Sequence, residues 1–448
     1  MKLEGFKENT KKKIIVISFT VLCLLLIAGV YLYTSYAFYE ETKNFNVING
    51  TVEDPGDLYF AYYVDGKISR TMPSKNTGYT LDTTKSSCDN GVTVDWDYSK
   101  WKANIYYENY SATDKTRTKC TLFFNKTAKT VKTALGNIEV NSYKPDLTKS
   151  ACDTSNCESH EKGIFETTDA DGTSYYYRGA VENNYLKFAG YFWRVVRING
   201  NGSIRIIYDG TSAHANGESS ADRQYGTSQF NTNYNNNMYV GYMYTSGEAH
   251  GTGTSSAIKT NADKFYTDKL SSYASKLDTN AGFCGDRSNL NQQSGVGTGT
   301  VITYNKGYLR VEESAPTLTC ENASDYYTVA SASSGNKKLS YPIGLITADE
   351  MMLAGHAGGV FDGSYNHMKS NNGSYLVTGN SFWTMTPAGG YNPFGTTYWV
   401  AVVFLVDASG LIDDNNVGGT SGLRPVVNLK SGVKITGSGT KTNPYVVS

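Results

Sequence analysis

Residues 192–208 read FWRVVRINGNGSIRIIY, two runs rich in β-branched and aromatic side chains around the tetrapeptide Asn199-Gly200-Asn201-Gly202. Asn-Gly pairs readily adopt the left-handed backbone conformations that a tight hairpin turn requires. The segment therefore predicts two antiparallel strands, 192–198 and 203–208, joined by this turn. Two further strands are expected just upstream, at 173–180 and 185–188, which places the hairpin in an antiparallel sheet.

The composition agrees with a chain built mainly from sheets. The chain has 36 tyrosines and 45 glycines but only 9 prolines among its 448 residues. Tyrosine is enriched in strands, while glycine and small polar residues suit the turns that connect them. The formal net charge is zero and charged residues make up 18%, so no basic surface for a nucleic acid is expected.

The C-terminal part of the chain shows the same strand pattern. From residue 400 to 406 both alternating faces are apolar, which predicts a strand buried on both sides at the centre of its domain. The turn Asp407-Ala408-Ser409-Gly410 follows this strand. Strands are expected at 398–406, 423–429 and 433–447.

Two helices are expected between these strand regions. Residues 262–277 place apolar side chains at helical spacing. Residues 347–353 predict a second helix, with Thr347 as N-cap and Glu350 three residues later, which is the arrangement of a capping box. The stretch 209–262, rich in Asn, Gly and Ser, is predicted to form long surface loops.

The N-terminus carries an apolar run, 14–33, interrupted only by one Ser, one Thr and one Gly. As a helix this run is about 30 Å long, the thickness of the hydrocarbon core of a bilayer. Lysines are in excess before it, which favours a cytoplasmic tail, 1–13, and an extracellular remainder. We predict a single-pass membrane anchor. The alternative is a signal peptide cleaved near Ser35-Tyr36-Ala37, which would make the protein secreted.

Four segments follow the predicted anchor. Residues 34–50 are expected to form a polar stalk, 51–127 a small immunoglobulin-like β-sandwich, 128–160 a connector, and 161–448 a larger α+β domain. In the connector, one helical turn is predicted before Gly136. Strands of the sandwich are expected at 58–64, closed by the turn Asp65-Gly66, and at 92–96, 101–107 and 120–124.

Six of the seven cysteines lie outside the apolar run, and an even number in an exported chain indicates disulfides. Six cysteines allow 15 pairings, of which the sequential one keeps each bridge within one expected structural unit. It joins Cys88 to Cys120, Cys152 to Cys157, and Cys284 to Cys320. Metal binding is the rival interpretation, but no histidine lies at ligand spacing from these cysteines, so no metal site is predicted.

Three blocks of sequence carry a family resemblance. They are FAGYFWRVVRI at 188–198, YPIGLITADE at 341–350, and a C-terminal set with FWTMTP at 382–387, VDASG at 406–410 and GLRPVVNL at 422–429. Together they resemble a family of exported proteins from gut Gram-positive bacteria that has no assigned activity. The resemblance covers 161–448 and implies a C-type-lectin-like fold in its formylglycine-generating-enzyme variant. Trp383 and Arg424 belong to this signature and are expected to be structural, Arg424 by pairing with a buried carboxylate or with carbonyl groups.

The resemblance implies two possible activities, copper-dependent oxidation and calcium-dependent sugar binding. The residues argue against both. Formylglycine-generating enzymes hold copper with a cysteine pair in the C-terminal part of the domain, but no cysteine follows Cys320 here. Sugar-binding C-type lectins hold Ca²⁺ with a carboxylate–Pro–amide tripeptide and a Trp-Asn-Asp motif, and neither occurs. Asp169-Ala170-Asp171-Gly172 is interpreted as a turn, because the later ligands of a calcium loop are missing. We therefore predict no cofactor and no catalytic residue.

The resemblance also implies a ligand face formed by loops in the C-terminal part. Loops rich in Tyr, Asn, Ser and Gly make adaptable recognition surfaces. Phe394, Tyr398 and Trp399 have the alternative of packing into the core, Trp399 above all because it lies beside the buried strand. The predicted ligand-binding residues are Tyr391, Asn392, Phe394, Thr397, Tyr398, Trp399, Asp413, Asp414 and Asn415.

These observations favour a non-enzymatic binding or adhesion protein of the cell surface that recognises an extracellular protein or glycan. Two alternatives stay open. One is an envelope-acting enzyme descended from a formylglycine-generating-type oxidase, and the other is a structural protein of the envelope. A cleft lined by titratable residues with strongly shifted pKa values would favour the enzyme, whereas a shallow aromatic face would favour the binding protein.

Overall fold

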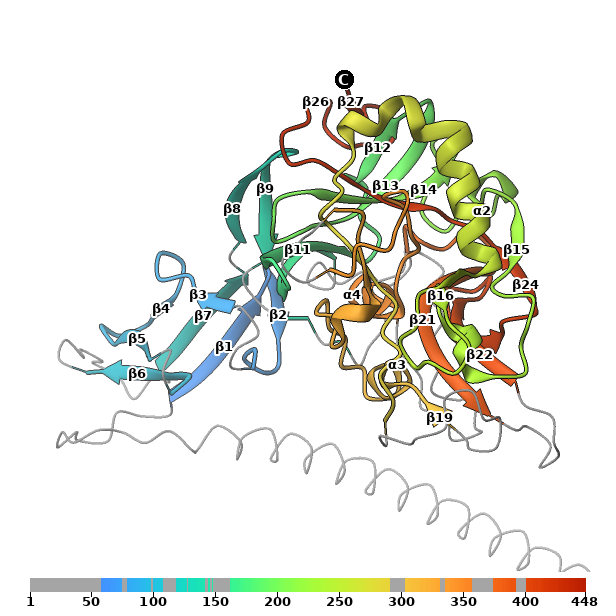
Figure 1. Cartoon of the computed structure of the whole chain (residues 1–448). Coiled ribbons are helices and arrows are strands. Elements are labelled where there is room, and N and C mark those ends of the chain that lie inside the picture. The colour runs from blue at the N-terminus through green and yellow to red at the C-terminus, as the bar shows by residue number, and fades with distance from the viewer. Residues whose placement is uncertain are drawn as a thin grey trace, which may run out of the picture. The chain divides into compact units, whose positions relative to one another are not determined.

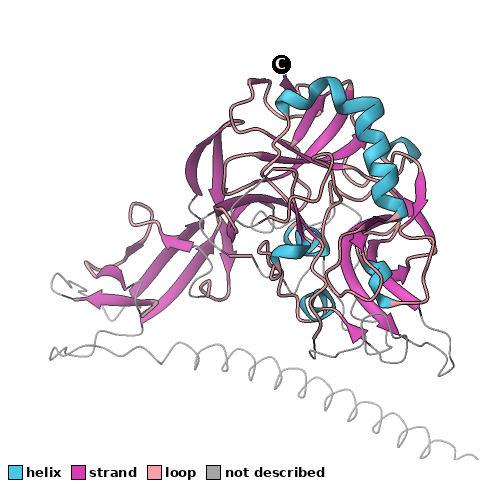
Figure 2. Cartoon of the chain, viewed as in Figure 1, coloured by secondary structure: helices cyan, strands magenta, loops and turns pink. Residues whose placement is uncertain are grey.

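The computed structural model describes residues 58–74, 79–97, 100–107, 118–126, 128–141, 144–145, 147, 162–290, 303–330, 335–356, 374–391 and 400–448. These residues fall into two compact units, one up to Asn125 and one from Lys126 onward. Strands dominate and helices are few (Figure 2). The predicted cytoplasmic tail, anchor and stalk lie outside the described residues. Within the described part of the chain, no helix combines the length and the apolar character needed to cross a membrane.

The smaller unit contains a five-stranded sheet and a separate two-stranded sheet. The larger of them has the order β2-β1-β7-β3, and β4 also pairs with β7. The hairpin of β5 (Thr93–Asp97) and β6 (Lys102–Tyr106) forms the other sheet. The predicted strands and the Asp65-Gly66 turn are confirmed. The remaining strands are β1 (Leu58–Val64), β2 (Lys67–Ser69), β3 (Tyr79–Leu81), β4 (Ser87–Cys88) and β7 (Thr118–Lys126).

Aromatic side chains and a disulfide hold the smaller unit together. The ring of Trp96 lies edge-on to that of Phe124, with 5.0 Å between the ring centroids. Cys88 and Cys120 face each other across β4 and β7 and form a disulfide. The larger unit contains the disulfide Cys284–Cys320, so two of the three predicted bridges are confirmed. Cys152 and Cys157 lie outside the described residues.

Residues 128–141 form a β-hairpin, so the predicted helical turn is wrong. β8 (Ala128–Thr133) pairs with β9 (Gly136–Asn141), and Gly136 has φ +91° in the turn. Ile138 and Val140 alternate with less buried residues along β9 and belong to the core of the larger unit. Gly136 therefore ends a hairpin turn rather than a helix. The period-two apolar pattern, which is typical of a strand, outweighed the glycine signal.

The predicted hairpin at 192–208 is confirmed, and it lies within an eight-stranded sheet. β13 (Tyr191–Ile198) and β14 (Ile204–Gly210) are antiparallel, with Ile198 opposite Ile204. The sheet order is β10-β11-β13-β12-β27-β26, and β14 also pairs with β25. The predicted strand at 433–447 is two short strands instead of one, because the chain reverses between them. The other strands are β10 (Gly163–Asp169), β11 (Gly172–Arg178), β12 (Tyr185–Phe188), β25 (Val426–Leu429), β26 (Ile435–Thr436) and β27 (Tyr445–Val447).

A six-stranded sheet comes mainly from the C-terminal part of the chain. Its order is β15-β24-β21-β22-β23, and β19 pairs with β21. Every residue of β22 is buried, which confirms the predicted central strand. One core cluster contains residues of both sheets, among them Trp193, Ile206, Trp383 and Val403. The strands are β15 (Thr227–Gln229), β19 (Thr303–Tyr304), β21 (Phe382–Tyr391), β22 (Val400–Val406), β23 (Ile412–Asn416) and β24 (Thr420–Gly422).

Both predicted helices are present. α4 (Ala348–Leu353) begins at the predicted capping box, in which Thr347 and Glu350 each accept from the other's backbone N–H. The other helix begins earlier than predicted, as α2 (Ala257–Phe265) capped by Ser256, and continues through η5 (Tyr266–Leu270) and η6 (Ser271–Lys276). Ile258, Ala262 and Phe265 are buried at helical spacing, so the apolar pattern extends further toward the N-terminus than the prediction placed it. A further helix, α3 (Lys306–Glu312), was not predicted.

Residues 209–262 are not the long surface loops predicted from their composition. Arg223, Phe230 and Tyr242 are fully buried there. Polar side chains serve the buried backbone, as where the Ser256 hydroxyl donates to the Tyr242 carbonyl at 2.9 Å. Sequence composition alone does not show which polar residues fulfil this internal role. The short elements of this stretch are η3 (Ala221–Arg223), β15, η4 (Asn237–Val240), β16 (Met243–Tyr244) and β17 (Thr254–Ser255), while β18 (Phe283–Cys284), η7 (Ala323–Asp325) and β20 (Tyr326–Tyr327) lie further on.

Candidate functional site

Strand pairing brings the two separate segments of the predicted ligand face to the same part of the six-stranded sheet. Val402 of β22 lies opposite Asn416 of β23, and Phe404 lies opposite Asp414. Tyr304 of β19 lies opposite Gly389 of β21. β19 pairs with the end of β21, and the end of β23 pairs near the start of β22 (Figure 1 labels β19, β21 and β22). Asp414 and Asp413 lie further along, opposite Phe404 and Leu405. At about 4.8 Å between strands, the four strands β19-β21-β22-β23 span about 14 Å.

The loop between β21 and β22 carries most of the predicted ligand-binding residues. Asn392, Phe394, Thr397, Tyr398 and Trp399 lie outside the described residues. Tyr391 is described only as the last residue of β21, without its side chain. The structure therefore describes the strands on either side of this loop and the neighbours that surround its two ends.

Two tyrosines that the sequence analysis missed lie at the same end of the sheet. Tyr304 and Tyr234 are 36% and 37% exposed, among the most exposed large aromatic side chains of the larger unit. The Tyr234 carbonyl accepts a hydrogen bond from the Ala401 N–H at 2.7 Å, which fixes this residue beside the start of β22. The Tyr304 ring packs on Tyr308, with 4.6 Å between the ring centroids. To predict that Tyr234 and Tyr304 belong to the site would have required knowledge of contacts between distant parts of the sequence.

A glycine allows the segment after Tyr234 to approach the sheet. A Cβ at Gly390 would lie 2.7 Å from the Cβ of Asn237, closer than such atoms come in proteins. Gly418 similarly lies against the Tyr234 ring, where an added Cβ would be 3.0 Å from the ring. Because neither glycine has a Cβ, the segment 234–240 has room to pack against β21 and β22. We give the name loop end to this region and to the part of β23 that continues from it. It consists of Tyr234 and Tyr304 near the start of β22, and of Asp413, Asp414, Asn415 and Asn416 along β23.

The carboxylates of the loop end lie in an unusual environment. Asp413 and Asp414 are both half-buried, and neither forms an ion pair with a described residue. Burial, together with the neighbouring Asp413 carboxylate, raises the pKa of Asp414 to about 6. Burial raises the pKa of Tyr308 to about 12, and the charges of Glu312, Tyr304 and Asp414 add to this effect. The loop end thus combines exposed aromatic rings with carboxyl and amide groups.

The raised pKa of Asp414 makes stability depend on pH. The folded carboxyl holds its proton to about pH 6, whereas an unfolded aspartate loses it near about pH 3.9. The charge therefore destabilises the folded chain above pH 6, and this penalty disappears as the pH falls toward 4. Asp414→Asn should raise the free energy of unfolding by about 1–2 kcal/mol at pH 7 and change it little at pH 4. Chemical denaturation at both pH values tests this; an equal effect at both would contradict it.

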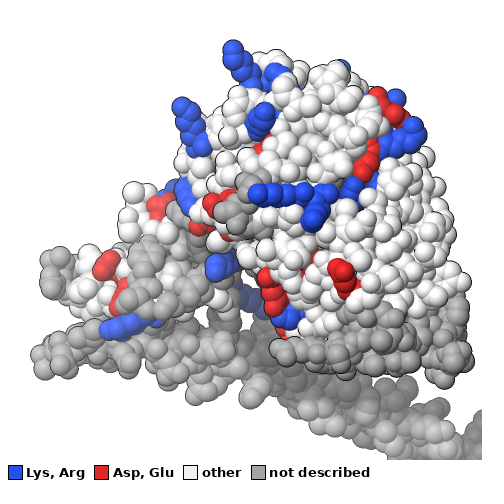
Figure 3. All heavy atoms as spheres, in the orientation of Figure 1, with Lys and Arg blue, Asp and Glu red and all other residues white. Residues whose placement is uncertain are grey.

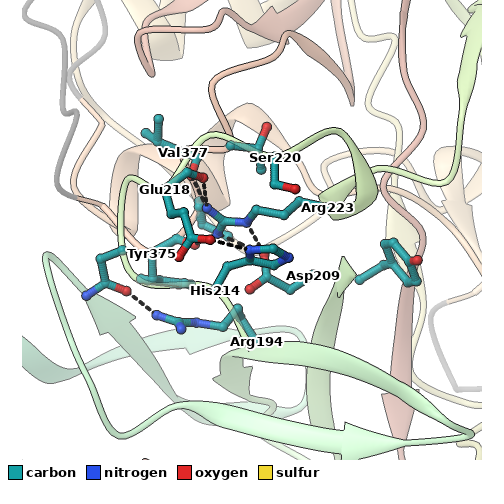
Figure 4. A network of polar contacts seen from close by, with 12 residues as sticks. Arg194, Asp209, His214, Glu218, Ser220, Arg223, Tyr375 and Val377 are labelled. Carbon is teal, nitrogen blue, oxygen red and sulfur yellow. Dashed lines mark hydrogen bonds and ion pairs between the residues drawn. The ribbon is translucent and has the colours of Figure 1, made fainter. Parts of the chain in front are cut away.

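One charged cluster of the larger unit is buried and serves the fold. Asp209 pairs with Arg223 at 2.8 Å and with Arg424 at 3.1 Å (Figure 4 labels Asp209 and Arg223). Arg424 also donates to the carbonyls of Tyr208 and Leu376. Trp383 is buried and donates its ring N–H to the Ser228 carbonyl at 2.8 Å. The structural roles predicted for Arg424 and Trp383 are confirmed.

A second buried network joins β10, β13, β14 and α4. Glu350 Oε1 lies 2.9 Å from Arg197 Nε and 2.5 Å from Arg205 Nε. Arg197 also pairs with Asp169 at 2.9 Å, and Asp169 accepts from the backbone N–H of Asp171 in the predicted turn. A small pocket of about 20 Å³ beside this network has room for a single water molecule. The signal in the sequence that could have predicted this network is the position of Arg197 and Arg205 within apolar strands, because buried arginines need charged or polar partners.

The described histidines make contacts of different kinds, and one of them, His214, contacts both a serine hydroxyl and carboxylates. His356 is buried between the Ser374 hydroxyl and the Gly410 carbonyl, and burial lowers its pKa to about 4. Since the other ring nitrogen of His356 contacts a carbonyl, this Ser–His contact lacks the carboxylate of a triad. His214 Nδ1 lies 2.9 Å from Glu218 Oε1 (Figure 4). Its Nε2 lies 3.3 Å from the Ser212 hydroxyl and 2.8 Å from Asp222 Oδ1, so Asp222 competes with Ser212 for this nitrogen. His250 contacts Asp325 at 2.7 Å, but the same carboxylate pairs with Arg287.

The loop end places exposed aromatic side chains near carboxyl and amide groups. Its rings can stack on an apolar ligand surface, and its carboxyl and amide groups can hydrogen-bond to hydroxyl or amide groups. In the described part of the chain, no three His, Cys, Asp or Glu side chains converge closely enough to hold a metal ion. Comparisons with family models, with curated proteins and with solved structures found no match to this chain.

Proposed function

We propose that this chain is a non-enzymatic binding protein of the cell surface, and that its larger unit recognises an extracellular glycan or protein through the loop end. One observation carries this proposal. The pairing of β19 with β21 and of β22 with β23 gathers exposed tyrosines and half-buried acidic residues from distant parts of the sequence. Tyrosine with small polar neighbours is the combination that adaptable recognition surfaces favour.

The wider setting belongs to the same proposal. The apolar run 14–33 anchors the chain in the membrane with the remainder outside the cell, and a cleaved run would leave a secreted protein. The larger unit is a C-type-lectin-like domain of the formylglycine-generating-enzyme variant, as the family resemblance implies. Support for this domain comes from the buried positions of Trp383 and Arg424, two residues of the family signature.

The smaller unit is, in this proposal, an immunoglobulin-like spacer. Its two separate sheets and the buried Trp96 in its core support this assignment. The parallel pairing of β1 with β7 departs from an all-antiparallel sandwich. A spacer would present the larger unit to ligands without contacting them itself.

A binding screen tests the proposed function. The whole chain in detergent micelles is applied to arrays of glycans and of cell-surface proteins, and each positive ligand is measured again with the double variant Tyr234→Ser/Tyr304→Ser. Loss of two exposed aromatic anchors should weaken binding about tenfold or more. The matched control is Tyr273→Ser, since Tyr273 is 39% exposed but lies on η6. The control should bind like the unaltered chain.

Two results would contradict the proposal. One is equal binding by the double variant and the control, because the loop end would then not be the ligand face. The other is silence on both arrays together with turnover of an envelope component by the chain. That second result would favour the envelope-acting enzyme, while silence without turnover would favour a structural envelope protein.

A further inference from the structure

A hollow of about 990 Å³ opens on the larger unit, and it shares no residue with the loop end. Four parts of the chain line it: the turn of the β13–β14 hairpin, the end of η6 with the residues after it, the connection from β25 to β26, and Ser448. Its size is at the upper end of the range of small-ligand sites in proteins. The side chains used below are Asn201, Lys276, Asp278, Lys430, Ser431 and Lys434.

Backbone hydrogen bonds hold the walls of this hollow in place. The Lys430 N–H donates to the Lys276 carbonyl at 2.9 Å, and the Asp278 N–H donates to the Asn428 carbonyl at 2.8 Å. The chain after η6 is therefore fixed along the end of β25. The third wall is joined to it through the Asn201 amide, which donates to the Asp278 carboxylate at 3.1 Å. The hollow is thus a defined feature of the fold.

The charge of the hollow is positive. Lys276, Lys430 and Lys434 line it, against the single acidic side chain of Asp278. That carboxylate is engaged by neutral donors, namely the Asn201 amide and the backbone N–H of Asn280 at 2.8 Å. Among the described residues, no Asp or Glu side chain forms an ion pair with any of the three lysines.

The lysine contacts that do exist leave positive charge in place. Lys430 donates to the carbonyl of Ser275 at 2.9 Å, and Lys276 donates to the main-chain oxygen of Ser448. With three ammonium groups present, the hollow stays positive even if Ser448 carries a terminal charge. Figure 3 shows a face of the larger unit with few charges, where blue Lys and Arg atoms gather toward the end that holds β26 and β27 in Figure 1.

We propose that this hollow binds a polyhydroxylated polyanion, meaning a chain of sugar or polyol units that carries carboxylate or phosphate groups. Ammonium groups on flexible stems attract anions without demanding a fixed bidentate geometry. The Asn, Ser and Thr side chains between them offer donors and acceptors to hydroxyl groups. This second site does not depend on the loop end, so it adds a ligand class to the binding function proposed above.

The test uses calorimetry on the whole chain with three probes: oligogalacturonate for carboxylates, polyglycerol phosphate for phosphates, and a neutral dextran fragment as the reference. At least one polyanion should bind more tightly than dextran. Its affinity should fall several-fold between about 50 mM and 300 mM salt, because exposed charges are screened. Whichever polyanion binds more tightly identifies the anionic group that the site prefers.

Matched variants locate the binding. The triple variant Lys276→Gln/Lys430→Gln/Lys434→Gln should bind about tenfold more weakly, since each exposed ion pair contributes a factor of about two to five. The control Lys187→Gln/Lys337→Gln/Lys338→Gln removes the same charge from exposed lysines elsewhere in the larger unit and should stay within about twofold. Thermal unfolding verifies that both variants are folded, and Lys→Arg at the three hollow positions should restore binding.

Two outcomes would overturn this inference. In the first, neither polyanion binds more tightly than dextran. In the second, the control weakens binding as much as the triple variant, which would show a diffuse charge effect. The Tyr234→Ser/Tyr304→Ser variant should bind the polyanion normally, so this inference and the proposed loop-end function can fail separately.

Discussion

Replacing Glu350 by glutamine should lower the free energy of unfolding of the larger unit by about 3–5 kcal/mol. Glu350 is 2% exposed, and one of its oxygens contacts both Arg197 and Arg205. The other oxygen accepts the Thr347 N–H that begins α4. The substitution removes the charge while keeping the shape, so Arg197 would keep only Asp169 as a charged partner and Arg205 would keep only carbonyl acceptors. Chemical denaturation followed by near-ultraviolet circular dichroism measures the change.

The pH dependence of this effect provides a second check. Burial alone would raise the pKa of Glu350, but the charges of Arg205 and Arg197 outweigh burial and lower it. A lowered carboxyl pKa stabilises the folded state above the unfolded pKa of about 4.3. This stabilisation is lost as the pH falls through the folded value. The difference between the variant and the unaltered chain should therefore shrink in strong acid.

A matched surface substitution controls for the loss of a glutamate. Glu166 pairs with Lys129, and both side chains are about half exposed. Glu166→Gln should change the free energy of unfolding by less than about 1 kcal/mol. Equal effects of the two glutamine variants would contradict the assignment of Glu350 as the centre of a buried network.

Replacing Asp209 by asparagine should destabilise the larger unit by about 3 kcal/mol or more. Asp209 is fully buried and is the carboxylate shared by Arg223 and Arg424. Both arginines keep carbonyl acceptors after the substitution, so the loss should lie at the lower end of the range of about 3–5 kcal/mol for breaking a buried ion pair. Arg223 donates to the carbonyls of Tyr375 and Val377, so the segment 374–378 should also exchange its amide protons faster. Denaturation and hydrogen exchange measure the two effects.

An exposed aspartate supplies the control for this second prediction. Asp268 pairs with Lys264 one turn away on the helix surface, and solvent screens such exposed pairs so strongly that they contribute little to stability. Asp268→Asn should therefore be nearly neutral. A small effect of Asp209→Asn, with unchanged exchange at 374–378, would show that the arginines are held by carbonyl groups alone.

Local signals in the sequence predicted the parts of the fold that depend on a few adjacent residues. The Asn-Gly repeat after Ile198 fixed the hairpin turn, the apolar run 400–406 identified the buried strand, and Thr347 with Glu350 identified the start of α4. Each of these signals acts within a few residues of the chain. Arg424 was also interpreted correctly, since a guanidinium in an apolar strand region requires a buried acceptor.

Features that depend on distant contacts were not predictable in the same way. Composition placed 209–262 on the surface, but Phe230 and Tyr242 pack into the core. Gly136 did not distinguish a helix from a hairpin, because glycine fits the end of a helix and a hairpin turn equally well. Burial of polar-rich segments follows from long-range packing, which a local window of sequence does not contain.

In the candidate site too, the residues with a local signal were predicted and those that depend on distant contacts were not. Sequence analysis selected Asp413, Asp414 and Asn415 on β23, but not Tyr234 and Tyr304. The two tyrosines come from segments that precede β23 by more than a hundred residues. They join the site only through the Tyr234 contact with Ala401 and the pairing of β19 with β21. These contacts between distant segments are what the structure adds to the sequence.

Hydrogen exchange of the whole chain, with and without a ligand selected from the arrays, tests the proposed ligand face most directly. The account predicts slower exchange in β19, in β23 and at 234–240 when the ligand is bound, with no change in the smaller unit. Protection confined to the smaller unit, or to segments of the larger unit away from the loop end, would contradict it.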